Sequence, residues 1–227
     1  VNKTSNSLNL YPDLSDELLD ELTDLVESPN LISANFDENF LKLPVEVLST
    51  VMKNHQRYIP LLKKNNTFSK LALSAEDILS TNFFVISNGF KESKNTIMKG
   101  NEKVLKARFS DAMFFVESDK KVFSKDRLEK LKSVSYLQGM GNVYQRVERI
   151  QYVAEKIFKC LDDKSLDKEK LIESARFCKH DLCSEIVYEF PELQGIMGGK
   201  YLKNEGYEDE VCLAVAEHYL PGFYKDH

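Results

Sequence analysis

Strand-forming sequence is confined to the first part of this chain, and this uneven distribution limits its possible folds more than any other feature. The runs RYIPLL, Arg57–Leu62, and NFFVISNG, Asn82–Gly89, are rich in β-branched and aromatic residues and are flanked by turn-forming residues, which is typical of strands. From Lys91 onward the sequence has no comparable run. We therefore expect any sheet before Lys91 and helices after it.

Two helices are expected among these strands. Ser15 suits the N-cap of the first, and Asp16 and Glu17 place acids in its first turn, where the helix dipole favours them. This helix should end near Pro29. A second helix should begin at Pro44, since proline suits the first helical turn. These elements together predict a small sheet with helices packed on it, an α+β arrangement.

Apolar residues recur at helical spacing through the rest of the chain and predict five further helices. In the longest of these, the apolar residues step by four and three, which describes one helical face. That face consists of Val143, Val147, Ile150, Ala154, Ile157 and Leu161. The expected helices span Lys94–Glu117, Lys125–Val134, Gln138–Leu161, Lys168–Phe190 and Glu208–Tyr219.

The length of the chain favours two domains. Its 227 residues, of which 42% are hydrophobic and 30% charged, can build two separate cores. We expect an α+β domain at residues 1–118 and an all-α domain at residues 119–227. The fold as a whole is predicted to be predominantly helical.

Charge is distributed unevenly along the chain. The net charge is -5, so the whole molecule offers no general electrostatic grip on nucleic acid and gives no reason to expect DNA as a partner. Residues 1–40 hold nine acids and one base, whereas residues 91–132 hold twelve bases and seven acids. A polyanionic partner should therefore prefer the middle of the chain.

The cysteines and the ends of the chain suggest where the protein works. Four cysteines without a CxxC pair, in a chain too large to need disulfides, indicate reduced thiols and a cytoplasmic location. No apolar run approaches the roughly 20 residues of a membrane helix, and no signal peptide is present, so we expect no membrane partner. Because the sequence starts at Val1 in a polar stretch, we expect it to be a piece of a longer polypeptide.

A basic ridge is predicted on the expected helix that starts at Lys94. Lys99, Lys103 and Lys106 fall within about 60° of one another on a helical wheel, and the apolar residues of this helix cluster about 120° away. An ordinary solvated face would have the same pattern. The alternative is a ridge that contacts phosphates in a salt-dependent, sequence-independent manner. The candidate phosphate-binding residues are Lys99, Lys103, Lys106, Arg108, Lys120 and Lys121.

The His180–Asp181 pair raises the possibility of metal chemistry. HD-type phosphohydrolases hold divalent metals through a histidine on one helix, an adjacent His-Asp on the next and a later aspartate, because imidazole and carboxylate suit metals that activate water. Arg149 occupies the position where the first histidine is expected, and an arginine would repel a metal. His218 alone does not repair this gap. We therefore expect an incomplete site that binds no metal.

Two other interpretations of this region are weaker. A zinc site through Cys178, His180 and Cys183, closed by Cys212 or His218, would match none of the usual structural zinc spacings. The stretch EFPELQGIMG, Glu189–Gly198, holds several acids but has no nucleophile or oxyanion hole nearby, and its proline and glycines suggest a structural corner. The chain contains no GxSxG, P-loop or GxGxxG motif.

Several longer stretches resemble the β subunit of the bacterial two-subunit glycyl-tRNA synthetase. The similarity covers about residues 22–227. It is carried by KHDLCSEIVYEF, EFPELQGIMGGKYL and AVAEHYLPGF, and upstream by KGNEKVLKARFSDAMFF, LPVEVLSTVMKNHQRY, FDENFL and LVE. The resemblance implies an internal fragment of a much longer subunit.

The family also implies what this fragment does. Its α subunit activates glycine with ATP and magnesium, while its β subunit recognises tRNA(Gly) and is needed for charging, so the whole is a class II glycine-tRNA ligase. The fragment alone is expected to be inactive and to bind no cofactor. Its helical half is expected to be HD-like, with Arg149, His180 and Asp181 as a degenerate site.

Two alternatives remain open from the sequence. One is a metal-dependent HD phosphohydrolase, and the other is an assembly module that docks the α subunit without touching RNA.

Overall fold

The computed structural model describes residues 1–64, 68–88, 91–161 and 166–221. The chain divides into two compact units, Val1–Phe114 and Phe115–His227. The expected strand end at Gly89 and residues 222–227 of the expected helical domain lie outside the described residues.

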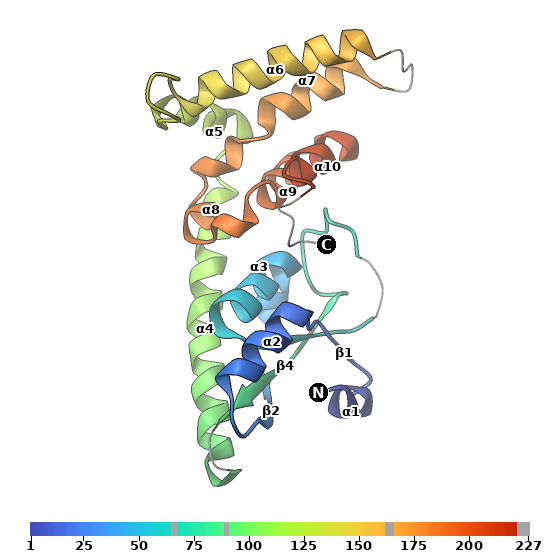
Figure 1. Ribbon diagram of the computed structural model, residues 1–227, viewed down its shortest axis with the longest axis vertical. Helices are drawn as coiled ribbons and strands as arrows, with labels where there is room; N and C mark the ends of the chain where they lie inside the picture. The colour runs from blue at the N-terminus through green and yellow to red at the C-terminus, as the bar shows by residue number, and fades with distance from the viewer. Residues whose placement is uncertain (65–67, 89–90, 162–165, 222–227) are drawn as a thin grey trace. The chain divides into compact units, whose positions relative to one another are not determined.

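The first unit is built on a four-stranded antiparallel sheet with strand order β1-β3-β4-β2 (Figure 1). β3 and β4 confirm the two strands predicted from sequence, whereas β1 and β2 were not predicted. β2 has a weak strand sequence, NLISAN, and is held by pairing along its whole length with β4, from Asn30 opposite Ser87 to Asn35 opposite Asn82. The strands span Tyr11–Pro12, Asn30–Asn35, Ile59–Leu62 and Leu79–Ser87.

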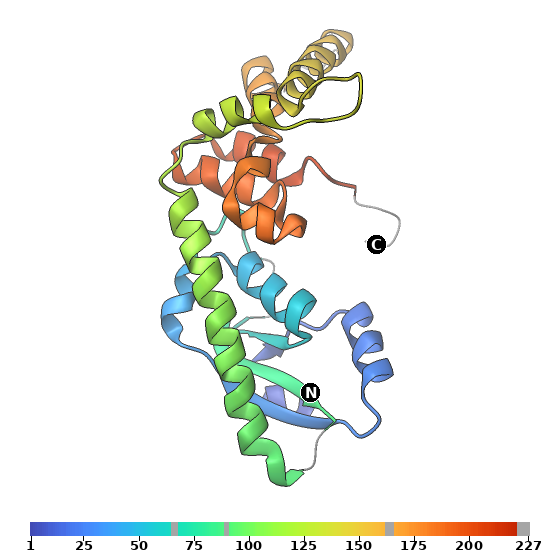
Figure 2. The same cartoon turned by 90° about the vertical axis from the view of Figure 1, so that its left-hand side faces the viewer.

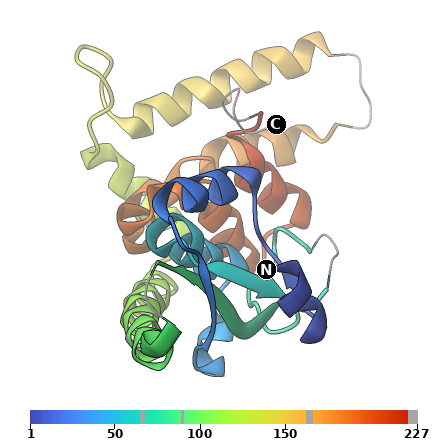
Figure 3. The same ribbon diagram turned by 60° about the horizontal axis from the view of Figure 1, so that its bottom comes forward.

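Helix α2, Asp16–Leu25, covers one face of this sheet (Figure 3). It begins as predicted, because the Ser15 hydroxyl accepts a hydrogen bond from the Leu18 amide at 3.3 Å. Leu18 and Leu22 pack in one buried cluster with Ile59, Leu61 and Phe84 of the sheet. Burying such side chains contributes about 1.5–3 kcal/mol each to folding.

Helix α4, Lys94–Asp119, packs its apolar edge on the other side (Figure 2). The ring of Phe109 meets Phe36 edge-on at 5.1 Å and Phe40 at 5.4 Å, and Phe36 in turn contacts Phe83 of β4 at 6.3 Å. The core is therefore a layer of aromatic rings between α4 and the sheet. The remaining elements of this unit are α1 (Asn2–Ser7), η1 (Glu38–Lys42), α3 (Val45–Thr50), η2 (Val51–His55) and η3 (Lys91–Ser93).

The second unit is helical, as predicted. Its described part has no strand, although Ser135 and Asn142 form an isolated bridge. Its elements are α5 (Ser124–Lys130), η4 (Leu131–Ser133), α6 (Val143–Cys160), α7 (Lys168–Phe177), η5 (His180–Cys183), α8 (Glu185–Glu189), η6 (Pro191–Leu193), α9 (Ile196–Asn204) and α10 (Asp209–Glu217). No helix in the described ranges is both long and apolar enough to cross a membrane.

Helix α6 begins later than the sequence pattern suggested. Gly139 and Gly141 have φ angles of 79° and 80°, which a helix does not allow. Asn142 then forms a capping box with Gln145, so the helix starts at Val143. Its apolar stripe is buried at Val143 and Val147, but Ile157 and Leu161 near its end are exposed.

The single helix expected at Lys168–Phe190 is wrong, because the chain leaves helical geometry after Phe177. The Ser184 hydroxyl donates to the Asp181 carbonyl at 2.6 Å and accepts from the Val187 amide at 3.4 Å, which starts α8 as a separate helix. Serine and aspartate compete for backbone hydrogen bonds in this way, and they break helices that periodicity alone would continue.

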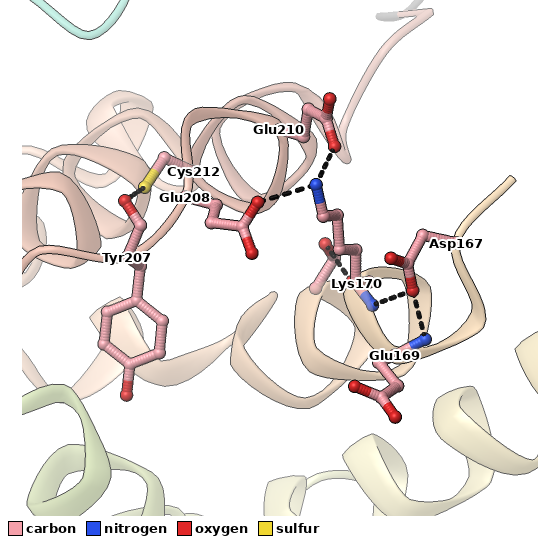
Figure 4. A network of polar contacts seen from close by, with 8 residues as sticks. Asp167, Glu169, Lys170, Tyr207, Glu208, Glu210 and Cys212 are labelled. Carbon is pink, nitrogen blue, oxygen red and sulfur yellow. Dashed lines mark hydrogen bonds and ion pairs between the residues drawn. The ribbon is translucent and has the colours of Figure 1, made fainter. Parts of the chain in front are cut away.

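Helix α7 is tied to the start of α10 by charged side chains. The Asp167 carboxylate caps α7 by accepting from the amides of Glu169 and Lys170. The Lys170 ammonium lies 2.6 Å from both the Glu208 and the Glu210 carboxylates (Figure 4). These two ion pairs raise the pKa of Lys170.

Candidate functional site

The basic ridge has the geometry that its sequence pattern predicts. Lys99, Lys103 and Lys106 are all exposed on α4. The opposite edge of the helix is fully buried and consists of Leu105, Phe109, Ala112 and Val116. No described carboxylate forms an ion pair with any of the three lysines. Such a face attracts polyanions.

The other candidate phosphate-binding residues lie close in sequence to the ridge. Arg108 is exposed on α4, and Lys120 and Lys121 are exposed in the turn that follows the helix. All six basic residues that the sequence suggested for phosphate binding are therefore exposed.

His180 is buried and structural. Its Nδ1 atom donates to the Phe177 carbonyl at 2.6 Å, and its ring meets the Phe177 ring edge-on at 5.7 Å. Burial lowers the pKa of His180 to about 4, so the ring is neutral at pH 7. With Nδ1 carrying the hydrogen, Nε2 is left as an acceptor inside the unit.

Asp181 acts as a cap for helix α9. Its Oδ2 atom accepts hydrogen bonds from the backbone amides of Gly195 at 2.6 Å and Gly198 at 3.0 Å. These are unpaired amides at a helix N-terminus, where a carboxylate is stabilising. Burial raises the pKa of Asp181 to about 6, although the two hydrogen bonds favour the charged form.

The stretch EFPELQGIMG is therefore not simply a corner. Gly195 turns the chain with a φ of 79°, but Gly198 and Gly199 lie inside α9. A Cβ atom on Gly199 would lie 2.5 Å from the Cys212 carbonyl, so this glycine permits close packing of α9 on α10.

Arg149 lies on the surface of α6 and not in the buried surroundings of His180 and Asp181. It is exposed, and its Nη2 atom donates to the Met140 carbonyl at 3.1 Å. It lines a shallow groove with Met140, Val153 and Ile157. The structure therefore brings His180 and Asp181 together but leaves Arg149 apart from them.

A half-buried histidine, His218, pairs with a lysine in the same unit. His218 Nδ1 donates to the Val215 carbonyl at 2.7 Å, which leaves Nε2 to accept from the Lys179 ammonium at 2.7 Å. The Lys179 ammonium also lies 3.6 Å from the centre of the Tyr219 ring. Burial lowers the pKa of Lys179 to about 8 and that of His218 to about 4.

The candidate zinc ligands Cys178, His180, Cys183, Cys212 and His218 do not form a metal-binding group. Across the described parts of the chain, no group of three or more His, Cys, Asp and Glu side chains could hold a metal ion. Burial raises the pKa of Cys178 and of Cys212 to about 11, which disfavours the thiolate that zinc requires.

Asp119 is a residue that sequence reasoning missed. Its carboxylate accepts from the amides of Glu185 at 2.9 Å and Ile186 at 3.1 Å and from the Tyr201 hydroxyl at 2.8 Å. Arg127 donates to its backbone carbonyl and stacks over the Tyr201 ring at 4.2 Å. One signal was available, because an acid at the last residue of a helix opposes the dipole and needs another reason to be there.

Comparison with known proteins places the chain in one family. The sequence profile described as "Glycyl-tRNA synthetase beta subunit" matches residues 1–227. The chain is similar to the glycine-tRNA ligase beta subunits of Listeria welshimeri, at 40% identity over 91% of the chain, and Thermodesulfovibrio yellowstonii, at 43% over 93%. The corresponding protein of Geobacter sulfurreducens is 42% identical over 97% of the chain.

The match covers only part of these relatives. The chain spans 28% of the Listeria protein, 29% of the Thermodesulfovibrio protein and 30% of the Geobacter protein. At 91–97% of the chain, the matched span includes parts of both units. The chain therefore belongs to the glycyl-tRNA synthetase beta subunit family.

Proposed function

We propose that this chain is a tRNA-recognising part of the β subunit of a two-subunit, class II glycine-tRNA ligase in the cytoplasm. It supports charging of tRNA(Gly) with glycine, and the α subunit carries glycine activation with ATP and magnesium. The chain itself supplies no catalytic residue. The observation that carries the proposal is the basic ridge, an exposed row of lysines on a chain of this family.

The basic ridge would bind the phosphate backbone of tRNA. Lys99, Lys103 and Lys106 project from a helix whose apolar edge is fixed in the core, so little backbone order would have to be gained on binding. Arg108 would add a contact from the same unit, and Lys120 and Lys121 would contact phosphates from the second unit. Contacts of this kind position RNA without reading its sequence.

The helical unit would then serve as an HD-like scaffold without hydrolase chemistry, in a domain that starts near residue 119. Two observations support this role. One oxygen of the Asp181 carboxylate accepts two backbone hydrogen bonds, and Arg149 lies exposed elsewhere on the unit. Neither observation favours the alternative of a metal-dependent phosphohydrolase.

A charge-neutralising variant tests the ridge. In the two-subunit enzyme with full-length β subunit, replacing Lys99, Lys103 and Lys106 together by Ala should weaken tRNA binding. Each lost phosphate contact lowers the slope of log affinity against log salt by about 0.7–0.9, so the slope should fall by about 2–3. Filter binding at several salt concentrations would measure it.

A matched control separates local contact from net charge. Lys159, Lys168 and Lys203 are paired with carboxylates in the second unit, so replacing these three by Ala changes net charge equally without removing the basic ridge. Unchanged tRNA affinity in the ridge variant, or an equal loss in the control, would contradict the proposal. Lost binding of the α subunit with intact tRNA affinity would favour the assembly module instead.

A further inference from the structure

Phe123 is an aromatic side chain whose position in the second unit has no structural explanation. It is the N-cap of α5, where Ser, Thr, Asp and Asn are favoured because their oxygens accept backbone hydrogen bonds, and it makes no such cap. It also does not pack, since its side chain is 66% exposed. No ring or cation contact of Phe123 occurs with any residue that the structure describes.

The turn that carries Phe123 is fixed firmly at both ends. On one side, the Asp119 carboxylate binds the start of α8 and the Tyr201 hydroxyl. On the other, the backbone amide and the hydroxyl of buried Ser124 both donate to the Glu205 carboxylate at 2.8 Å. The backbone that carries Phe123 is therefore fixed before any partner binds, which lowers the ordering cost of a contact at this position.

Four charged side chains within three residues of Phe123 are exposed, and three of them are basic, the exception being Asp126. Lys120, Lys121 and Lys125 are exposed, and within the described residues none of them forms an ion pair. Lys132, Lys170 and Lys203 of the same unit are paired with carboxylates. Lysine is depleted at protein–protein interfaces, so these neighbours favour a polyanionic partner over a protein.

We propose that residues 120–125, the Phe123 turn, bind an unpaired base of an RNA, with the base stacked on the Phe123 ring and adjacent phosphates near Lys120, Lys121 and Lys125. This inference rests on the proposed function and adds a site to it. The base must be unpaired because stacking requires a free base face, which single-stranded ends and loops of RNA offer and a duplex does not.

Activity of the full two-subunit enzyme gives the first test. Stacking of a base on an aromatic ring contributes strongly to RNA affinity. Phe123→Ala should therefore raise the KM for tRNA about tenfold, with kcat little changed. Phe123→Tyr should keep the wild-type KM, because its ring stacks equally well. The control is Tyr188→Ala, since Tyr188 is 87% exposed but has Glu185, Glu189 and Glu192 nearby in sequence; this change should leave KM unaltered.

A fluorescence experiment tests stacking directly. The chain contains no tryptophan, so Phe123→Trp in the 227-residue protein introduces a single reporter. A short single-stranded RNA should quench its emission, and the same RNA annealed to its complement should not. Equal quenching by both, or by neither, would overturn the proposal.

The remaining outcomes distinguish a failure of the stacking site from a failure of the proposed function. If Phe123→Ala leaves the KM for tRNA unchanged while the basic-ridge variant raises it, the stacking site is wrong and the proposed function stands. If neither variant affects tRNA, both are wrong. If Phe123→Ala instead weakens association of the two subunits, the partner of the Phe123 turn is a protein.

Discussion

The Asp181 carboxylate lies 3.0 Å from the backbone nitrogen of Gly198, and a Cβ atom added to that glycine would lie 3.1 Å from the same oxygen. A side chain at position 198 would therefore crowd the same carboxylate oxygen that the amide binds. The adjacent Gly199 makes the equivalent close approach to α10. These contacts make the glycines of α9 sensitive to any added atom.

Replacing these glycines by alanine should destabilise the helical unit to different degrees. Gly199→Ala would place a methyl group 2.5 Å from the Cys212 carbonyl and 2.8 Å from Ala216 Cβ, so we expect the free energy of unfolding to fall by about 3 kcal/mol. Gly198→Ala meets a looser contact and should lose about 1–2 kcal/mol. Urea denaturation followed by circular dichroism would measure both.

The control for this pair is Gly100→Ala in α4, where nothing lies within 4 Å of the added Cβ. This change should stabilise by about 0.5–1 kcal/mol, because alanine has the higher helix propensity. A uniform loss at all three glycines would show that close packing is not the cause.

Removing the Asp181 carboxylate should destabilise more than removing an exposed cap. Asp181→Ala leaves the amides of Gly195 and Gly198 buried without an acceptor, so we expect a loss of about 2–4 kcal/mol in unfolding free energy. Asp181→Asn keeps an acceptor oxygen and should lose less. Asp167→Ala removes an exposed cap of α7 and should lose only about 1 kcal/mol. Equal effects of Asp181→Ala and Asp167→Ala in urea denaturation would contradict this account.

Acidification should destabilise the folded chain between pH 6.5 and 4. Burial lowers the pKa of His180 and of His218 from 6.5 to about 4, so in this range the unfolded chain binds protons that the folded chain does not. The free energy of unfolding therefore rises with pH across this window and decreases as the pH falls. Asp181 opposes the trend, because its pKa is raised from 3.8 to about 6 and the folded chain binds the extra proton.

Variants at His180 and Asp181 separate the contribution of the histidine to this pH dependence from that of the aspartate. His180→Gln should reduce the slope of unfolding free energy against pH by about 1.4 kcal/mol per pH unit, the value for one proton. Asp181→Asn should steepen the slope, since it removes the opposing proton. The measurement is urea denaturation at half-unit pH steps, and a wild-type slope in His180→Gln would show that this histidine does not titrate as described.

Asp119 should be among the most sensitive positions of the helical unit. Asp119→Ala removes the acceptor of two amides and of the Tyr201 hydroxyl, and it leaves these three donors without a partner. We expect a loss of about 3–5 kcal/mol, because each buried donor left unsatisfied costs about 1–3 kcal/mol. Tyr201→Phe removes one partner only and should lose about 1 kcal/mol. Thermal unfolding that ranks these two variants in the opposite order would refute this role.

The part of the fold that follows from local pattern could be predicted from sequence. Strands β3 and β4, the cap at Ser15 and the two edges of α4 all depend on residues that are close in the chain. Strand β2 could not be predicted, because its hydrogen bonds are made with β4 far along the sequence. The separate start of α8 was missed because local hydrogen bonds of the Ser184 hydroxyl to the backbone override apolar periodicity.

The candidate site was predictable to a similar extent. Lysine spacing was enough to place the basic ridge on the surface. The absence of a working metal site at His180 and Asp181 stays a prediction, and the sequence gave no indication that Asp181 caps α9. That role depends on glycines that looked like turn residues, because sequence alone cannot distinguish a glycine chosen for its φ from one chosen for close packing.

The capped start of α9 gives a practical rule for searching uncharacterised genomes. An aspartate followed fourteen and seventeen positions later by glycines, as Asp181 is by Gly195 and Gly198, describes a carboxylate already committed to backbone amides. A His-Asp dipeptide found with this spacing should not be assigned to the phosphohydrolases on the dipeptide alone. Scoring the downstream glycines together with the dipeptide would separate aspartates that bind backbone amides, as Asp181 does here, from aspartates whose oxygens have no such partners.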